Sequence, residues 1–280
     1  MSTYFVGRDQ ETTSPPRASN SRMAKTALVL SGGGMFGAYQ AGAWRALSRV
    51  VKPDIVVGAS VGALNGWLIA AGLAGEDLVQ HWLDPASGEL MPYRRPPLSW
   101  EGVFDPQPLR NRAKLLLEHH SPRVDYGVVL VHLPRLRPKL FRNQEVTWQH
   151  LVASCAVPGG FPPVRIGGAL YFDGGVLETL PIWAAEEMGA TRVIAVNALR
   201  FVSPWAVGIV LKGMRRLSRV PPRAAGGPEV TLITPTENLG KFLDGATWRR
   251  ENIVRWMELG EADAIAALGR DVGCQISKEA

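Results

Sequence analysis

Short runs of apolar and β-branched residues recur along the chain, separated by longer stretches in which small and apolar residues repeat at helical spacing. The runs are typical of buried strands and lie at residues 27–30, 54–57, 128–131, 169–172, 192–196 and 230–233. The stretches predict helices at residues 38–50, 63–74, 109–119, 146–154, 181–189 and 248–268. The first two strand and helix pairs form a βαβα unit, whose crossover requires parallel strands. The pattern therefore predicts an α/β fold with a mainly parallel central sheet.

Three other stretches lack such a pattern. Residues 1–22 are rich in Ser, Thr, Pro, Arg and Gln, which predicts a flexible N-terminal tail before a single domain over residues 23–280. Residues 83–108 contain many of the prolines and are expected to wrap the surface. Residues 156–164 combine proline and glycine too closely for regular structure, so they predict a rigid loop.

Composition narrows the class of protein. A chain of 280 residues with 46% hydrophobic and 20% charged residues is typical of globular proteins. The net charge of +6 favours an anionic partner such as a phospholipid surface or nucleic acid, and it equally fits a surface charged for solubility. The distant Cys155 and Cys274 predict no disulfide framework and fit a reducing compartment. No apolar run approaches the ~20 residues of a membrane span and no secretory signal pattern is present, so we expect a cytoplasmic protein.

The most informative stretch is the turn around Ser60, between the strand at residues 54–57 and the helix at residues 63–74. Gly58 and Gly62 flank the serine in the pattern G-x-S-x-G. In a nucleophile elbow, such glycines allow a strained turn that exposes the hydroxyl at the end of a strand. The same pattern also fits a small-residue turn without chemistry, so the turn by itself leaves both interpretations open.

A glycine-rich loop from Gly32 to Gly37 follows the first strand and fits the pattern G-x-G-x-x-G. In a dinucleotide site, an acidic residue at the end of the second strand would hold the ribose, but Asp54 precedes that strand and Ser60 follows it. Otherwise, consecutive glycines before a helix present backbone N–H groups to an anion. Beside a nucleophilic serine, that anion would be the oxyanion of a tetrahedral intermediate.

A serine nucleophile needs a base, and Asp173 is the remaining candidate. The usual order Ser, Asp, His is absent with this aspartate, because every histidine precedes it in the sequence: His81, His119, His120, His132 and His150. We expect structural or surface roles for these histidines. Asp173 ends a predicted strand and is followed by Gly174 and Gly175, which leave its carboxylate uncrowded, although it also fits a turn or helix cap.

Four motifs in this order resemble the patatin-like phospholipases. They are SGGGMFGAYQAG at residues 31–42, GASVG at residues 58–62, ASCAVPGGFPPV at residues 153–164 and DGG at residues 173–175. The resemblance extends from about residue 25 to about residue 268. It implies a three-layer α/β/α sandwich and calcium-independent hydrolysis of acyl esters. Two cysteines offer no metal cluster, so we expect no cofactor.

The resemblance also implies roles for particular residues. It implies a catalytic dyad of Ser60 and Asp173, and an oxyanion hole made by the amides of Gly32, Gly33 and Gly34. The further motif glycines are Gly37, Gly58, Gly62, Gly174 and Gly175. Phe36 departs from the pattern, since many relatives carry Arg or Lys there. The backbone oxyanion hole does not depend on this side chain, but a charge role at this position is not expected.

The predicted function is therefore that of a serine acyl hydrolase acting on lipid or phospholipid esters, of the phospholipase A or lysophospholipase type. One alternative is a general carboxylesterase for small soluble esters. Another is a protein that binds lipid or a nucleotide without chemistry, against which the presence of both a nucleophile and a base argues. No nucleic acid partner is expected.

A basic and apolar stretch at residues 201–220 is a candidate membrane-facing segment. The residues expected to face the membrane are Trp205, Lys212, Arg215, Arg216 and Arg219. From about residue 207, apolar and basic residues separate onto two helix faces, as in helices that contact anionic lipid at the membrane surface. A surface helix with a solvated basic face, or a lid, fits the same pattern. The run Pro134 to Lys139 is a second basic candidate.

Overall fold

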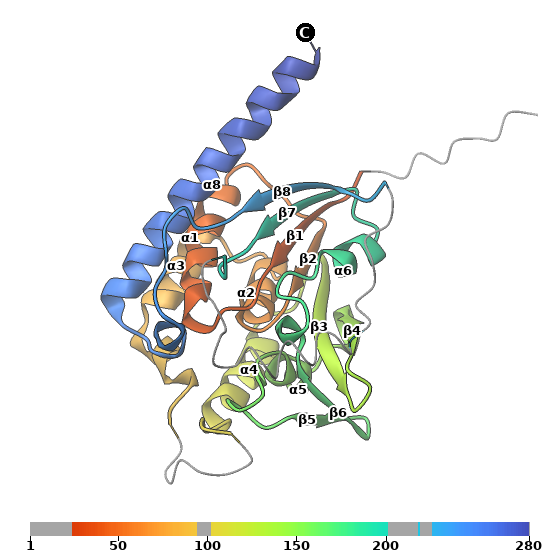
Figure 1. Cartoon of the computed structure of the whole chain (residues 1–280), viewed down its shortest axis with the longest axis vertical. Helices are drawn as coiled ribbons and strands as arrows, with labels where there is room; N and C mark the ends of the chain where they lie inside the picture. Colours follow the sequence, from red (N-terminus) through yellow and green to blue (C-terminus); the bar gives the residue numbers. More distant parts are fainter. Residues whose placement is uncertain (1–23, 94–101, 201–217, 219–225, 280) are drawn as a thin grey trace, which may run out of the picture.

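The computed structural model describes residues 24–93, 102–200, 218 and 226–279. At the centre of this part lies an eight-stranded sheet of order β5-β6-β3-β2-β1-β7-β8, in which β4 also pairs with β3 (Figure 1). The strands are β1 (Thr26–Leu30), β2 (Ile55–Gly58), β3 (Asp125–Leu133), β4 (Arg137–Arg142), β5 (Val164–Ile166), β6 (Ala169–Asp173), β7 (Arg192–Val196) and β8 (Glu229–Ile233). The pairs β1–β2, β1–β7, β2–β3 and β7–β8 are parallel, which confirms the predicted mainly parallel sheet.

Helices cover both faces of the sheet. They are α1 (Gly37–Leu47), α2 (Val61–Ala70), α3 (Gly75–Leu83), α4 (Gln107–His119), α5 (Trp148–Ser154), α6 (Ile182–Glu187) and α8 (Arg250–Glu279). Short 3-10 turns are η1 (Gly34–Phe36), η2 (Pro85–Leu90), η3 (Asn143–Glu145), η4 (Gly174–Val176) and η5 (Phe242–Ala246). Side chains alternate along a strand, so Leu28 packs in a core with α1 and α2, whereas its neighbour Val29 packs with Trp183 of α6. The fold is thus the three-layer α/β/α sandwich that was predicted.

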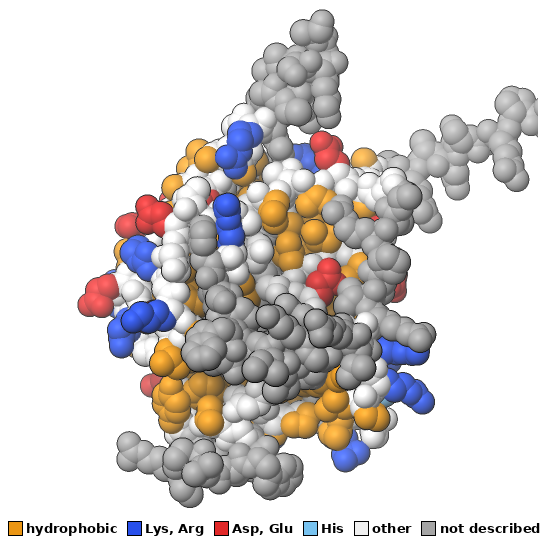
Figure 2. All heavy atoms as spheres, viewed as in Figure 1, with side chains coloured by type: hydrophobic (Ala, Val, Ile, Leu, Met, Phe, Trp, Pro, Cys, Tyr) orange, Lys and Arg blue, Asp and Glu red, His pale blue; other side chains and the backbone are white. Residues whose placement is uncertain are grey.

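Helix α8 lies along α1 and supports the loop before it (Figure 1). The two helices approach so closely that a Cβ on Gly42 would overlap the Met257 carbonyl group. At the start of α1, the Phe36 ring packs edge-on against Trp256 of α8, with ring centroids 4.9 Å apart. Figure 2 shows charged side chains of both signs on this left side of the molecule. The packing of α8 therefore anchors the glycine-rich loop between β1 and α1.

The structure differs from the sequence prediction in several places. Helix α3 was not predicted, and α8 extends to Glu279, beyond the predicted end at residue 268. The helix predicted at residues 63–74 ends at Ala70, because Gly72 adopts φ 92° and the chain turns before α3. The antiparallel strand β4 was not predicted, and β5 begins inside the stretch predicted as a loop. The predicted tail at residues 1–22 lies outside the described residues. So do Trp205, Lys212, Arg215, Arg216 and Arg219.

Candidate active site

Ser60 lies at the turn from β2 into α2, where its backbone has φ 55° and ψ −132°. A positive φ is uncommon for residues other than glycine, and such conformations cost about 1–3 kcal/mol. Gly58 and Gly62 allow the turn, because a Cβ on Gly58 would overlap the Gly62 carbonyl oxygen. The local sequence therefore holds Ser60 in a strained conformation at the carboxyl end of β2.

Asp173 reaches the same place because β2 and β6 share one edge of β3. The β2 pairing with β3 ends at Gly58 opposite Val128, and the β6 pairing covers Leu130 opposite Asp173 and the residues beyond. Strand β4 overlaps both registers, so it occupies the opposite edge of β3. Strands β2 and β6 therefore approach each other end to end. One carries Ser60 just beyond its last residue, and the other ends at Asp173.

Both side chains are withdrawn from solvent, with 7% of Ser60 and 2% of Asp173 exposed. Burial raises the pKa of the Asp173 carboxyl from 3.8 to about 7, and hydrogen bonds with the Ser60 side chain and the Gly175 N–H oppose this rise. The Gly175 N–H donates to Asp173 Oδ1 at 2.7 Å. A carboxylate with this raised pKa is a stronger base near neutral pH than an exposed aspartate.

The glycine-rich loop lies against both residues. A Cβ on Gly32 would be 3.2 Å from the Cβ and 3.9 Å from the Oγ of Ser60. A Cβ on Gly175 would be 3.1 Å from Asp173 Oδ1 and 3.9 Å from the Gly32 Cα. The fold thus brings together three stretches that are far apart in the sequence, at residues 31–42, 58–62 and 173–175.

The amides of the loop differ in what they bind. The Gly32 N–H donates to the Thr179 carbonyl at 3.2 Å. Among the described residues, the N–H groups of Gly33 and Gly34 donate to no backbone carbonyl. Gly33 has φ 151° and Gly34 has φ 57°, conformations that glycine adopts readily. Of the three amides predicted to face an anion, that of Gly32 is therefore already hydrogen-bonded, whereas the N–H groups of Gly33 and Gly34 can donate to an anion.

A buried polar network joins this loop to the helix that follows Ser60. Gln40 of α1 donates through Nε2 to the Ser31 carbonyl at 2.6 Å, immediately before the glycines. Asn65 of α2 donates through Nδ2 to Gln40 Oε1 and to the Gly37 carbonyl, at 3.0 Å in both cases. The Trp82 indole N–H donates to Asn65 Oδ1 at 3.0 Å. Because each member is buried and hydrogen-bonded, the network fixes the position of the loop relative to α2.

The end of α5 supplies two residues that motif reasoning missed. The Ser60 N–H donates to Ser154 Oγ at 2.8 Å, and Ser154 is fully buried. Burial raises the pKa of the adjacent Cys155 thiol, the charge of Asp173 adds to this rise, and hydrogen bonding with the Ser60 side chain opposes it. Cys155 therefore stays a neutral thiol beside Ser60 and Asp173. The only sequence signal for either residue is its place in the motif at residues 153–164.

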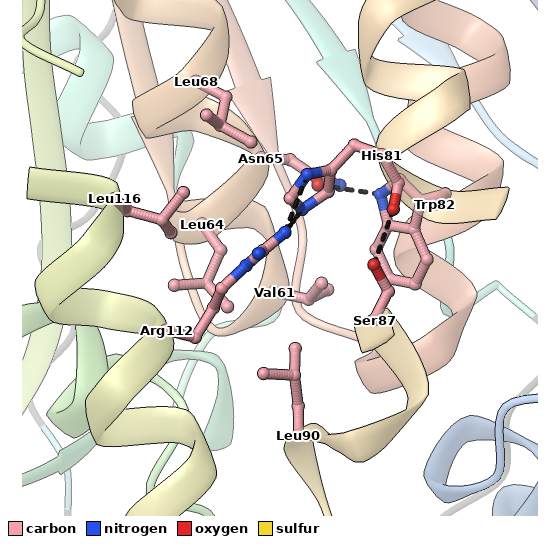
Figure 3. A pocket seen from close by; sticks show the side chains of 10 residues that line it. All are labelled: Val61, Leu64, Asn65, Leu68, His81, Trp82, Ser87, Leu90, Arg112 and Leu116. Carbon is pink, nitrogen blue, oxygen red and sulfur yellow. Dashed lines mark hydrogen bonds between the residues drawn. The ribbon is translucent and has the colours of Figure 1, made fainter. Parts of the chain in front are cut away.

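A small cavity of about 30 Å³ lies beside α2, on the side away from the sheet (Figure 3). It is lined mainly by apolar side chains such as Leu64 and Leu68, and at its edge the Arg112 guanidinium is hydrogen-bonded to the His81 ring at 2.7 Å. Burial lowers the pKa of His81 to about 4, and the charge of Arg112 adds to the decrease. A cavity of this size holds a water molecule and not an acyl chain, so it is not a substrate site.

None of the five histidines takes the place of Asp173. His150 accepts a backbone N–H at the start of α5, and the His132 ring packs against that of Tyr171 with centroids 5.4 Å apart. Within the described part of the chain, no histidine forms a hydrogen bond with Ser60 or Asp173.

The position of Asp54 argues against a dinucleotide site. Asp54 Oδ2 accepts the Thr26 N–H at 2.9 Å, at the amino end of β1, whereas the glycine-rich loop follows the carboxyl end of that strand. The described residues contain no cluster of three or more potential metal ligands. They also contain no helix that is long and apolar enough to cross a bilayer.

Both the sequence and the fold are similar to those of known proteins. The sequence profile of the patatin-like phospholipase family matches residues 28–186, more than half of the chain. The lysophospholipase nte1 of Aspergillus oryzae is 28% identical over 89% of this chain, and an uncharacterized NTE family protein of Mycobacterium bovis is 29% identical over 65% of it. VipD of Legionella pneumophila shares the fold, with a TM-score of 0.52 and 13% identity, covering 88% of this chain and 67% of VipD.

The chain belongs to the patatin-like phospholipase family, a family of lipid hydrolases. It spans only 18% of the Aspergillus oryzae relative and 51% of the Mycobacterium bovis relative.

Proposed function

We propose that the protein hydrolyses fatty-acyl esters of phospholipids or lysophospholipids without calcium, with Ser60 as nucleophile and Asp173 as base. The observation that carries the proposal is the meeting of Ser60, the buried Asp173 carboxyl and the glycine-rich loop at the carboxyl ends of β1 and β2. The similarity to a lysophospholipase and the membership of a phospholipase family support the lipid substrate.

In the proposed mechanism, the Asp173 carboxylate accepts the proton of the Ser60 hydroxyl as the oxygen attacks the ester carbonyl carbon. The amides of Gly33 and Gly34 donate to the oxyanion that develops on the carbonyl oxygen. When the tetrahedral intermediate collapses, Asp173 returns the proton to the leaving alcohol or lysolipid, which leaves an acyl group on Ser60. Asp173 then accepts a proton from water as the water oxygen attacks the acyl ester, and it returns this proton to the Ser60 oxygen as the fatty acid leaves.

The proposal is tested by incubating purified protein with a mixture of phospholipids, lysophospholipids and a short soluble ester. We expect release of fatty acid from the lipids in the presence of EDTA, and a steep rise in rate when the substrate forms micelles or vesicles. A Ser60→Ala variant serves as the control for contaminating esterases. Equal rates on dispersed and aggregated substrates would instead favour a carboxylesterase for small esters.

The rate of hydrolysis is expected to rise with pH through about 7, where the pKa of Asp173 lies. Only the deprotonated carboxylate can accept the serine proton, so kcat/KM should fall about tenfold for each pH unit below 7. An exposed aspartate, with a pKa near ~3.9, would give a flat profile above about pH 5. The measurement is kcat/KM for a soluble ester between pH 5 and 9 at constant ionic strength. A flat profile across this range contradicts the assignment of Asp173 as a buried base.

A further inference from the structure

An open groove of about 870 Å³ lies between the tips of two hairpins, one joining β3 to β4 and the other joining β5 to β6. Arg135 and Arg165 line the groove together with His132, Leu133 and Leu170, and none of its lining residues is acidic. The groove therefore combines cationic and apolar side chains at the surface.

Four exposed basic side chains line or surround the groove: Arg135, Arg137, Lys139 and Arg165. We call the groove together with these four side chains the basic groove. Within the described residues, none of the four forms an ion pair, although Arg142 at the far end of β4 pairs with Glu187 at 2.7 Å. In Figure 2, the charged side chains visible at the lower right, where Figure 1 places β4, β5 and β6, are basic. This concentration of unpaired positive charge attracts anions.

Local contacts orient these cations without neutralising them. Arg165 donates through Nη1 to the Gly168 carbonyl at 3.0 Å, which leaves its other guanidinium N–H groups for a ligand. Lys139 Nζ lies 4.6 Å from the centroid of the Phe141 ring. At the turn between β5 and β6, a Cβ on Gly167 or Gly168 would meet no atom within 4 Å, so the mouth of the groove is open.

Strand β6 connects the basic groove to the candidate active site. Leu170 lies in the groove, and Asp173 is three residues farther along the same strand, about 10 Å away at the usual rise per residue. Guanidinium groups bind phosphate oxygens through paired hydrogen bonds, and the neighbouring leucines can contact lipid tails. A single-stranded nucleic acid fits less well, because its bases need aromatic stacking partners that the groove lacks apart from His132.

We infer that the basic groove docks the protein on an anionic phospholipid bilayer, with lipid phosphates against Arg135 and Arg165. This inference rests on the proposed lipid hydrolysis, because the basic groove would be the surface through which the candidate active site meets its lipid substrate. It does not depend on residues 201–220.

The test compares a variant with serine at Arg135, Arg137, Lys139 and Arg165 with a control that removes the same charge elsewhere. The control carries serine at four exposed basic positions: Lys52, Arg123, Lys241 and Arg249. Binding is measured by sedimentation with phosphatidylcholine vesicles that contain or lack phosphatidylserine. We expect the wild type and the control to bind the anionic vesicles. The groove variant should lose at least about tenfold in affinity, since each basic residue adds to the attraction of an anionic surface.

Hydrolysis of a soluble short-acyl ester separates this inference from the proposed function. The groove variant should keep wild-type kcat/KM on that ester, whereas Ser60→Ala should keep vesicle binding and lose hydrolysis. Equal loss of vesicle binding in the groove variant and the control would reduce the effect to net charge and overturn the inference. Unchanged vesicle binding together with lost binding of a single-stranded oligonucleotide would assign the groove to nucleic acid and overturn it as well.

Discussion

Replacing Asp173 by asparagine is expected to lower kcat on a soluble acyl ester by about 10²–10⁴-fold while the fold stays intact. Asparagine has nearly the same shape, and its Oδ1 can still accept the Gly175 N–H, which lies 2.7 Å from the carboxylate oxygen. The amide cannot accept the proton of Ser60, so the loss reports proton transfer and not packing. Steady-state hydrolysis and circular dichroism measure the two properties separately.

A matched control for this substitution is Asp84→Asn. Asp84 Oδ1 also accepts the N–H of the residue two positions on, that of Ala86 at 3.0 Å, but it lies at the start of η2. The control should keep wild-type turnover. Near-normal turnover in Asp173→Asn itself, with a native circular dichroism spectrum, would remove Asp173 from the role of base.

The stability of Asp173→Asn should also depend on pH differently from that of the wild type. The pKa of Asp173 is about 7 in the folded protein against 3.8 for an ordinary aspartate, so the folded state holds the proton more tightly. The stability that this preference contributes is present in full below about pH 4 and is lost as the pH rises to about 7. Asparagine does not ionise. The melting temperature of Asp173→Asn should therefore exceed that of the wild type at pH 8 and approach it at pH 4.

Sequence patterns were most informative where the chain alternates strand and helix. The parallel order around β1 and β2 followed from two short apolar runs, because a crossover helix between them leaves few other arrangements. The turn at Ser60 could be located for the same reason, since Gly58 and Gly62 leave room that no other residue would. These features depend on residues close together in the sequence.

Features that depend on long-range pairing could not be predicted in the same way. Strand β4 alternates exposed and less exposed residues, but its sequence RPKLFR combines three basic residues with Pro138, so its composition resembles a basic loop. The proximity of Asp173 to Ser60 requires that β2 and β6 share one edge of β3, a register that no local pattern specifies. The expectation that Asp173 lies near Ser60 came from the resemblance to a family and not from a local pattern.

The loop amides show a further limit of motif reasoning. Three consecutive glycines look equivalent in the sequence, but the Gly32 N–H is taken by the Thr179 carbonyl, which belongs to a segment almost 150 positions away. Which amides can meet an oxyanion therefore depends on tertiary hydrogen bonds. The buried pair of Gln40 and Asn65 holds the loop in this arrangement, and their spacing in the sequence gave no indication of contact.

Substituting Ser60 by either alanine or glycine is expected to reduce hydrolysis by at least about 10³-fold, because the nucleophilic oxygen is lost. A fluorophosphonate probe should modify Ser60 in the wild type and leave both variants unlabelled, as read by mass spectrometry of the peptide that contains residue 60. Labelling of a different serine in the wild type, with retained turnover in Ser60→Ala, would assign the nucleophile elsewhere.

The two variants should differ in stability, because the backbone at residue 60 has φ 55° and ψ −132°. This conformation costs a residue with a Cβ about 1–3 kcal/mol, whereas the extra freedom of glycine in the unfolded chain costs up to about 1 kcal/mol. The strain term is larger, so Ser60→Gly should melt about 2–4 °C above Ser60→Ala. A lower melting temperature for Ser60→Gly would mean that the turn stores no strain. A higher one, together with lost hydrolysis, indicates that the chain accepts reduced stability to present this hydroxyl.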